Sequence, residues 1–588
     1  MCSIFGYYKL NNRAVHKDFV QTAFSLMRHR GPDHEHFEEI DERVGLGHQR
    51  LAIIDLCSDA NQPMHLNECY IAYNGELYNY IELKEGLKDL NLHFMTSSDT
   101  EVLLNGLVQE GVRFLNKCNG MFAFAFYDKS TKKLILGRDR FGVKPLHYMI
   151  QDNILYYSSE IKPLIKIKHS LEKNLRIYDS FIRDLATDYD EETFIEGIFQ
   201  LKKGHYLICS DNYVKTYQWY YGGDFSFDRK IFADDKDVSE FTEDLLCDAI
   251  AKRLRADVPV CITLSGGLDS TTIYTVIKER LKKDIQPFTF IHPGSGTDEQ
   301  EKVNKLVRPY DEKLLCVQSN YQQGYKQVEE ALHYLEFPIW NLSAIAYMDM
   351  YRTIREHRFR VVVEGHGSDE QLGGYPTVIR SAVFEYLRKF KLRKAFNIYK
   401  VLGETANADI GGKNSILRMG GAFIRNAVLN KKLDVSFGRS VMDVFDYRIL
   451  PIVLRTFDRI TMRSSVESRS PFMDYRLVEF FKQMPLKYKV SELGSKVMLR
   501  QILRKYNKDY IYKDKKKMGF AYDLPAFFTS QKNRDYMRER ILAFDIDGYS
   551  GLKERALSDV TKKHIGWRDT EAIWKIASLS VVNSMYGL

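Results

Sequence analysis

The first residue that could do chemistry is the cysteine at position 2, in the opening stretch MCSIFG. If Met1 is removed, Cys2 carries a free α-amino group beside its thiol. An α-amine has a pKa of about 7.7–8.0 and a thiol one of about 8.5, so the amine can accept the thiol proton near neutral pH. N-terminal threonine nucleophiles are activated in the same way. Taken alone, Cys2 fits better as an ordinary small residue near the start of a strand, so the rest of the chain has to decide.

A glycine-rich loop, LSGGLDS at residues 264–270, lies between an apolar strand-like run and an amphipathic helix-like run. Gly266 and Gly267 allow the backbone to approach a ligand closely, and N–H groups at a helix start bind anionic oxygens. Asp269 supplies a carboxylate suited to Mg²⁺. Because no lysine closes the loop, as one does in G-x-x-x-x-G-K-[ST], we expect a bound pyrophosphate rather than a transferred γ-phosphate. The alternative is a helix N-terminus that follows a simple glycine turn.

The next candidate strand ends in EGHGSDEQLGGY, residues 364–375. Gly365 and Gly367 permit a tight backbone path. If the two strands are neighbours, Asp369 lies near the first loop and becomes a second Mg²⁺ ligand. Alone, this stretch would also fit a glycine-rich turn with solvated acids.

Two patterns of elements surround these motifs. The first part of the chain has short apolar segments broken by Gly, Asn and Asp, among them a predicted hairpin with its turn at 128–132, which indicates an α+β domain rich in sheet. Beyond a polar, acidic stretch at 232–240, the predicted linker, strand-like and helix-like runs alternate. Such alternation predicts a parallel, doubly wound sheet that binds ligands at the carboxyl ends of its strands. The region from 378 to 588 is mainly helical in pattern. We predict two domains, 2–215 and 236–588.

Composition and charge exclude several classes of protein. A chain of 588 residues is longer than one hydrophobic core usually serves, so two or more domains are expected. The net charge of +8 is modest and both signs are interspersed, so nucleic acid is not expected as a partner. No apolar run is long enough to span a bilayer and no basic-then-apolar leader is evident, so no membrane is expected either. The eight cysteines show no metal-like spacing, which favours a reducing, cytoplasmic location.

Motifs along nearly the whole chain resemble those of the glutamine-hydrolysing asparagine synthetase family. In that family a class II glutamine amidotransferase with an N-terminal cysteine is fused to an AMP-forming synthetase. The matching stretches run in order from residue 2 to about 520: CSIFG, MRHRGPD, QRLAIIDL, YNGELYN, SSDTEV, GMFAFAFYD, GRDRFGVKPL, SSEIKPL, LSGGLDS, EGHGSDE, VESRSPFMD and KKKMGF. The resemblance implies an α+β N-terminal glutaminase sandwich of the Ntn type, followed by an α/β synthetase domain with a doubly wound parallel sheet and a helical C-terminal part.

The resemblance also implies roles in glutamine hydrolysis. Cys2 would attack the side-chain amide of glutamine, so we expect active protein to begin at Cys2. Asn74 and Gly75 would form the oxyanion hole, in which each pre-placed donor is worth about 3–4 kcal/mol. Three further residues would bind the glutamine substrate. Arg50 would bind the α-carboxylate of glutamine, and Glu76 and Asp99 would bind its amine. For Arg50 and Asp99 the alternative is a structural ion pair.

A second set of residues matches the synthetase site of the family. The implied ATP-binding residues are Leu264, Ser265, Gly266, Gly267, Asp269, Ser270, Phe290, Glu364, Gly365 and Lys517, and the implied Mg²⁺ ligands are Asp269 and Asp369. A carboxylate would attack the α-phosphate of ATP to become an acyl-adenylate, and ammonia from the first domain would displace AMP. Adenylation supplies the leaving group that a carboxylate lacks. The products would be an amide, glutamate, AMP and pyrophosphate, with aspartate as the default acceptor.

The motif EGHGSDE departs from the family pattern. His366 stands where the family usually has glutamate, or glutamine in related groups, and Glu364 replaces a small residue. The chain is then either an asparagine synthetase with a tolerated variant or a paralogue that amidates another acid, such as a sugar uronic acid or a natural-product acid. We expect His366 to lie at the acceptor end of the pocket and to act in acceptor binding or proton transfer. The alternative is a histidine that only supports the loop.

Three other classes fit the sequence less well. Ring-forming synthetases of β-lactam and lasso-peptide pathways often lack the cysteine, and an enzyme using free ammonia would not need the glutamine-binding residues. A degenerate scaffold on this fold would be expected to lose Cys2, Asp269 or Asp369, and all three are present. The expected partners are therefore glutamine, ATP and a carboxylate acceptor, and a homodimer is the one assembly that we consider.

Overall fold

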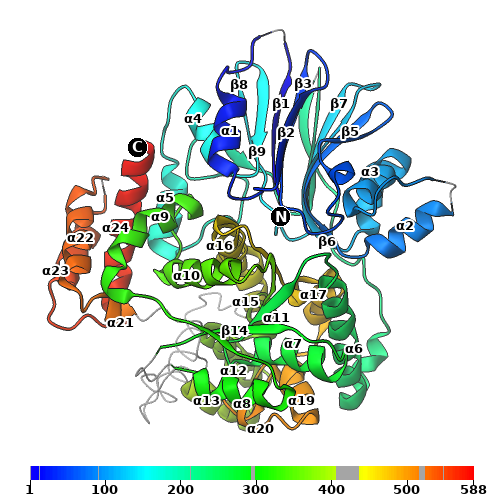
Figure 1. Ribbon diagram of the computed structural model, residues 1–588. Helices are drawn as coiled ribbons and strands as arrows, with labels where there is room; N and C mark the ends of the chain where they lie inside the picture. Colours follow the sequence, from blue (N-terminus) through cyan, green and yellow to red (C-terminus); the bar gives the residue numbers. More distant parts are fainter. Residues whose placement is uncertain are drawn as a thin grey trace.

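The computed structural model describes residues 2–11, 13–89, 92–211, 213–292, 298–405, 436–515, 524–546 and 548–588. It combines a sandwich of two antiparallel sheets, a parallel sheet flanked by helices, and a helical C-terminal part (Figure 1). The predicted fold class is therefore confirmed.

Two six-stranded sheets form the sandwich. The first has the order β10 (Phe199–Gln200), β8 (His147–Gln151), β9 (Ile154–Ser158), β1 (Ser3–Lys9), β3 (Val44–Arg50) and β2 (His34–Glu39). The second has the order β12 (Tyr213–Gln218), β11 (His205–Ser210), β7 (Lys133–Arg138), β6 (Gly120–Asp128), β5 (Cys69–Leu77) and β4 (Met64–Leu66). In β1, Ile4 and Tyr8 pack between the sheets, whereas Phe5 and Tyr7 pack with α1 (Phe19–Met27). Because successive side chains of a strand point to opposite faces, β1 is buried on both of them.

The predicted hairpin is present as β6 and β7. Asp128 pairs with Lys133 across its end. The Asp128 carboxylate accepts hydrogen bonds from the backbone N–H groups of Ser130 and Thr131, at 3.0 and 3.3 Å. An aspartate that bonds the backbone two and three residues ahead stabilises a turn, so this local signal was sufficient to place the hairpin.

The parallel sheet has the order β15 (Leu315–Val317), β14 (Gln286–Phe290), β13 (Val260–Thr263), β16 (Val361–Val363) and β17 (Glu467–Arg469). The chain begins in the middle with β13, adds β14 and β15 on one side, and then adds β16 and β17 on the other. The direction of growth reverses between β13 and β16, and a crevice opens beyond the carboxyl ends of strands at such a point. LSGGLDS follows β13 and EGHGSDE follows β16. The prediction that their strands are neighbours is confirmed.

Helices make up most of the remaining chain. Those around the parallel sheet are α6 (Asp235–Arg253), α7 (Leu268–Glu279), α8 (Gln300–Val307), α9 (Tyr325–Leu335), α10 (Ser343–Glu356), α11 (Ser368–Leu372), α12 (Pro376–Arg388), α13 (Leu392–Thr405), α15 (Phe437–Asp443), α16 (Leu450–Arg463), α17 (Tyr475–Gln483) and α19 (Val497–Lys505). At the C-terminal end α22 (Gln531–Ala543), α23 (Ser550–Val560) and α24 (Trp567–Tyr586) pack together. Among the residues that the structure describes, no helix is long and apolar enough to cross a membrane.

The acidic stretch at 232–240 is not the open linker that its composition predicts. Instead α6 begins inside it, at Asp235, and the carboxylate of Asp234 accepts a hydrogen bond from the Lys236 N–H at 2.6 Å. Acidic side chains stabilise a helix N-terminus by pairing with its free N–H groups, so the same residues that suggested solvent exposure cap a helix here. The predicted domain limits remain a prediction.

Candidate active sites

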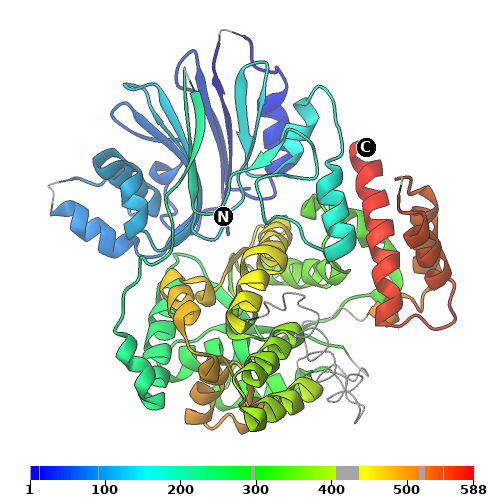
Figure 2. The same ribbon diagram turned by 180° about the vertical axis from the view of Figure 1, so that it is seen from behind.

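Cys2 lies directly before β1, at the end of the sandwich that faces the second domain (Figures 1 and 2). Its backbone N–H donates to Asn74 Oδ1 at 3.1 Å, and its carbonyl accepts a hydrogen bond from Arg30 Nε at 3.1 Å. The side chain is buried, and this burial raises the pKa of the Cys2 thiol. A thiol whose pKa is raised needs a base in direct contact before it can act as a nucleophile.

The predicted oxyanion residues lie on β5, next to Cys2. Asn74 is fully buried, and within the described residues its Nδ2 has no hydrogen-bond partner. A buried amide donor without a partner is costly, so it is available to a developing negative charge. A side chain at Gly75 would lie 2.3 Å from the carbonyl oxygen of Met121, so only glycine fits there. The sandwich therefore holds Asn74 against Cys2, with Gly75 next to it on β5.

Two predicted glutamine-binding acids are buried near this site. Glu76 forms an ion pair with Arg469 of β17, at 3.1 Å, and burial raises the pKa of Glu76 while Arg469 opposes the rise. Asp99, the first residue of α3 (Asp99–Glu110), accepts hydrogen bonds from the Tyr73 hydroxyl at 3.1 Å and the Leu77 N–H at 2.9 Å. Burial raises the pKa of Asp99 to about 6. Its carboxylate would gain most from a cationic partner, such as the α-ammonium of an amino acid.

Arg50 ends β3 and turns its guanidinium into the loop that follows. It donates to the carbonyl oxygen of Cys57 and to Asn61 Oδ1, both at 2.8 Å, and also to the carbonyl oxygen of Asp55. Within the described part of the chain it forms no ion pair with Asp99, and the roles of both residues in glutamine binding stay predictions. The loop therefore fixes the Arg50 side chain without neutralising its charge.

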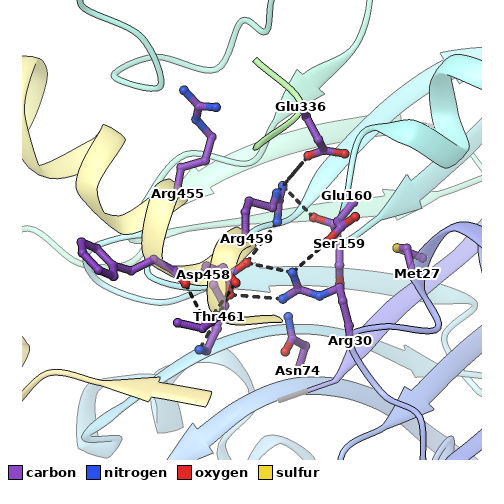
Figure 3. Close-up of polar contacts among 12 residues, drawn as sticks. Met27, Arg30, Asn74, Ser159, Glu160, Glu336, Arg455, Asp458, Arg459 and Thr461 are labelled. Carbon is purple, nitrogen blue, oxygen red and sulfur yellow. Dashed lines mark hydrogen bonds and ion pairs between the residues drawn. The ribbon is translucent and has the colours of Figure 1, made fainter. Parts of the chain in front are cut away.

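A buried charge network connects the Cys2 site to the second domain (Figure 3). Arg30 donates two hydrogen bonds to Asp458 of α16, at 2.9 and 3.1 Å, and one to Glu160 at 3.0 Å. Arg459, the next residue of α16, bonds Asp458 at 3.1 Å and Glu336 at 2.8 Å. Since Arg30 also holds the Cys2 carbonyl, α16 is joined to the nucleophile through a single side chain. Sequence analysis missed Asp458, which stands in none of the recognised motifs.

The two predicted metal ligands lie close together in the crevice. Lys496 Nζ contacts both oxygens of Asp269, at 2.8 and 2.6 Å, and Asp369 Oδ1 at 2.6 Å. Two carboxylates that approach one cation are the type of donor that Mg²⁺ prefers, so these residues fit the metal by chemistry. Within the described residues no third His, Cys, Asp or Glu joins them, so phosphate or water oxygens would have to complete the metal's ligands. Burial lowers the pKa of Lys496, but the two carboxylates outweigh it and raise the pKa above its usual range. Sequence analysis missed Lys496, while the predicted Lys517 lies outside the described residues.

Glycines allow the two loops of the crevice to meet. A side chain at Gly365 would lie 2.7 Å from the Cβ of Asp269, and Gly266 has a positive φ of 67°. A cavity of about 390 Å³ lies above them. Of the predicted residues, it is lined by Leu264, Ser265, Asp269, Ser270, Glu364, Gly365, His366 and Asp369, and not by Gly266, Gly267 or Phe290.

His366 lies between this cavity and the glutaminase domain. It also lines a second, small cavity of about 30 Å³ whose walls include Gly120 and Met121 of β6. Its Nε2 is 3.2 Å from Glu364 Oε2, and its ring stacks on Phe457 of α16 with centroids 3.3 Å apart. His366 therefore lines the synthetase cavity, and both its predicted place at the acceptor end and its chemical role stay predictions.

Glu364 is buried beneath His366 rather than exposed to a nucleotide. Its carboxylate accepts hydrogen bonds from Thr263 Oγ1 at 3.0 Å, from the Tyr351 hydroxyl at 2.7 Å and from Ser468 Oγ at 2.5 Å. Burial alone would raise the pKa of Glu364, but His366 and these donors hold it below its usual range. The carboxylate is thus kept ionised next to the imidazole, and its hydrogen-bonding capacity is largely used within the protein.

Two family models match the chain. Residues 1–220 match the model of a glutamine amidotransferase domain, and residues 242–584 match the model of asparagine synthase. The chain belongs to the asparagine synthase family. Membership confirms the resemblance seen in the motifs. It implies glutamine and ATP as substrates and amide synthesis as the type of reaction.

Among the relatives of this chain, some are named amidases and others asparagine synthetases. The chain is 27% identical to Amidase chry2 of Gibberella zeae and 26% identical to Amidase chyE of Penicillium rubens, in each case over 85% of this chain and 84% of the relative. It is 24% identical to asparagine synthetase (glutamine-hydrolyzing) 1 of Bacillus subtilis, over 93% of this chain and 90% of that protein. Similarity of this degree does not select the acceptor acid.

Proposed function

We propose that this member of the asparagine synthase family transfers the amide nitrogen of glutamine to a carboxylic acid other than aspartate, with cleavage of ATP to AMP and pyrophosphate. The observation that carries the proposal is that His366 borders both cavities, one reaching the glutaminase domain and one holding Asp269 and Asp369. Two facts support an acceptor other than aspartate. His366 and Glu364 replace the residues usual in asparagine synthetases, and two relatives are named amidases.

In the first half-reaction the Cys2 thiolate attacks the amide carbon of glutamine. Asn74 Nδ2 and the backbone N–H of Gly75 donate to the oxyanion as it forms. The α-amine of Cys2, freed by removal of Met1, takes the thiol proton and passes it to the amide nitrogen as the carbon–nitrogen bond breaks. Ammonia leaves, and water hydrolyses the thioester to glutamate and restores the thiol. Asp99 holds the α-ammonium of glutamine, and the positive charge of Arg50, which the loop fixes but does not neutralise, attracts its α-carboxylate.

In the second half-reaction an oxygen of the acceptor carboxylate attacks the α-phosphorus of ATP. The bond from this phosphorus to the β-phosphate breaks, and pyrophosphate leaves. Mg²⁺ held by Asp269 and Asp369 would neutralise charge on the phosphates. Lys496, which bridges the same carboxylates, adds a fixed positive charge at the point where pyrophosphate departs. N–H groups at the start of α7 bind the phosphate oxygens.

Ammonia then attacks the acyl carbon and AMP leaves, after which the new amide nitrogen must lose a proton. We assign this proton to His366. With its Nε2–H directed to Glu364, the ring can accept a proton at Nδ1, which has no hydrogen-bond partner among the residues that the structure describes. The ionised Glu364 stabilises the imidazolium that forms. Stacking on Phe457 fixes the orientation of the ring.

The test is a product assay with glutamine, ATP, Mg²⁺ and a panel of acids that includes L-aspartate and D-glucuronate. The proposal predicts that one acid other than aspartate gives amide, glutamate, AMP and pyrophosphate with a higher kcat/KM than aspartate does. It also predicts that His366→Glu shifts the preference towards aspartate. Asparagine as the preferred product of the wild-type protein would refute the choice of acceptor.

A further inference from the structure

The synthetase cavity has several aromatic side chains in its wall. Trp340, Tyr347 and Phe457 line it, together with Met350 and Val453. The rings of Tyr347 and Phe457 meet edge to face, with centroids 4.7 Å apart and planes at 62°. Trp340, in the loop between α9 and α10, is partly buried and keeps part of its surface open. A flat apolar group could therefore pack against this wall.

The charged residues of the same cavity are acidic, apart from His366. Asp269, Glu364, Asp369 and Glu370 all line it, and among its described lining residues there is no lysine or arginine. The ammonium of Lys496 is bound to Asp269 and Asp369. An acceptor with a second carboxylate would place another negative charge here without a described cation beside it. Buried charges without partners are strongly disfavoured.

From the wall and the charges we infer that the acceptor is a monocarboxylic acid bearing an aromatic ring, and that Trp340 and Tyr347 bind this ring. The inference rests on the proposed function and names the class of acid that it uses. Aromatic pairs in offset or edge-to-face geometry are stabilised beyond the area that they bury. L-Aspartate offers no ring and carries a second carboxylate, so it matches neither feature of the cavity.

This binding mode also orients the reacting group. With the ring against Trp340, the carboxylate of the acid points towards His366 and Gly365, where the two loops of the crevice meet. An oxygen of that carboxylate can then form its bond to the α-phosphorus as pyrophosphate leaves. Ammonia entering past His366 would meet the acyl carbon on the same side.

The experiment is ATP–pyrophosphate exchange, which reports adenylation without ammonia, using 3-phenylpropionate, L-aspartate and D-glucuronate as probes. We expect kcat/KM with 3-phenylpropionate to exceed the other two values by about tenfold or more. Trp340→Leu should raise the KM for 3-phenylpropionate by about tenfold. It should change the KM for ATP and the rate of glutamine hydrolysis by less than about twofold.

Two further variants separate ring binding from general damage. Trp340→Phe keeps an aromatic ring and should restore the KM to within about threefold of wild type. Tyr213→Leu removes an exposed tyrosine from the edge strand β12, far along the chain from the cavity, and should change none of these values. An unchanged KM in Trp340→Leu would overturn the role of Trp340 and with it the inference.

The three probes test the aromatic acceptor separately from the proposed amidation. A preference for D-glucuronate overturns the aromatic acceptor but leaves the proposed amidation intact, whereas a preference for L-aspartate overturns both. If none of the three acids supports exchange, binding of 3-phenylpropionate is measured by saturation-transfer NMR. Binding that is lost in Trp340→Leu supports the inference, and no binding to the wild-type protein overturns it. Failure of the proposed function shows instead as the absence of amide from every acid in the panel.

Discussion

Replacing Asp458 by asparagine should uncouple the two active sites. The carboxylate of Asp458 accepts two hydrogen bonds from Arg30 and one from Arg459, all in a buried setting. Breaking a buried ion pair usually costs about 3–5 kcal/mol. Because Arg30 keeps its contact with Glu160 at 3.0 Å, we expect the lower end of that range, about 3 kcal/mol, in the free energy of unfolding.

The effect on glutamine hydrolysis follows from the contact between Arg30 Nε and the Cys2 carbonyl at 3.1 Å. If Arg30 moves, this charge-assisted hydrogen bond, worth about 1.5–3 kcal/mol, is lost and Cys2 is no longer held against Asn74. The kcat/KM for glutamine should then fall by about 10- to 100-fold. Amide formation from added ammonia should stay within about threefold of wild type, because Asp458 is not among the residues that line the synthetase cavity.

The assays are glutamate release and ammonia-dependent amide formation, measured on Asp458→Asn and on Glu330→Gln. Glu330 pairs with Arg463 of the same helix, α16, but its side chain is 40% exposed, so its loss should cost little. Unchanged glutamine hydrolysis in Asp458→Asn would refute the proposed link between α16 and Cys2. An equal loss of both activities would show that the network supports the fold as a whole and not the nucleophile.

Three further predictions concern single residues. Cys2→Ala should abolish glutamine hydrolysis, measured as glutamate release, and spare amide formation from ammonia; hydrolysis at the original rate would show that Cys2 is not the nucleophile. Asp269→Asn should abolish pyrophosphate release and leave glutamine hydrolysis largely intact, because only the crevice loses a carboxylate; equal loss of both activities would point to misfolding. The pKa of Asp99, raised to about 6, predicts that this acid loses its charge as the pH falls below 6, so kcat/KM for glutamine should drop on that limb of a pH profile. In Asp99→Asn the KM for glutamine should be higher and this limb absent, whereas a limb that persists would assign it to another group.

Local sequence patterns predicted the main elements of the fold and the two loops that meet in the crevice. Alternating strand-like and helix-like runs gave the parallel sheet, and LSGGLDS and EGHGSDE ended the strands that proved to be neighbours. Their meeting follows from the sheet order, because the chain reverses its direction of growth between β13 and β16. Composition did not reveal that α6 begins inside the acidic stretch, since the same residues suit a solvated linker and a helix cap.

Contacts between segments that are far apart in the sequence could not be predicted from local patterns. Lys496 reaches Asp269 across 227 positions, and Arg30 reaches Asp458 across 428. Neither pair has a periodicity or spacing that a local pattern could reveal. The first depends on how the elements of the second domain pack, and the second on how the two domains meet. Glu364 was predicted to bind ATP from its motif, whereas its carboxylate is taken up by Tyr351, Ser468 and His366. These partners could be identified only from the structure, in which Tyr351 of α10 and Ser468 of β17 lie next to the end of β16.

The transfer of nitrogen from glutamine to the acceptor acid is tested most directly with glutamine labelled with ¹⁵N in its side-chain amide. The protein is incubated with this glutamine, ATP, Mg²⁺, unlabelled ammonium and the acid that gives exchange. We expect the amide product to carry ¹⁵N, and glutamate, AMP, pyrophosphate and amide to form in equal amounts. An amide that carries only unlabelled nitrogen, or glutamine hydrolysis that proceeds without any AMP, would show that the two reactions are not linked as proposed.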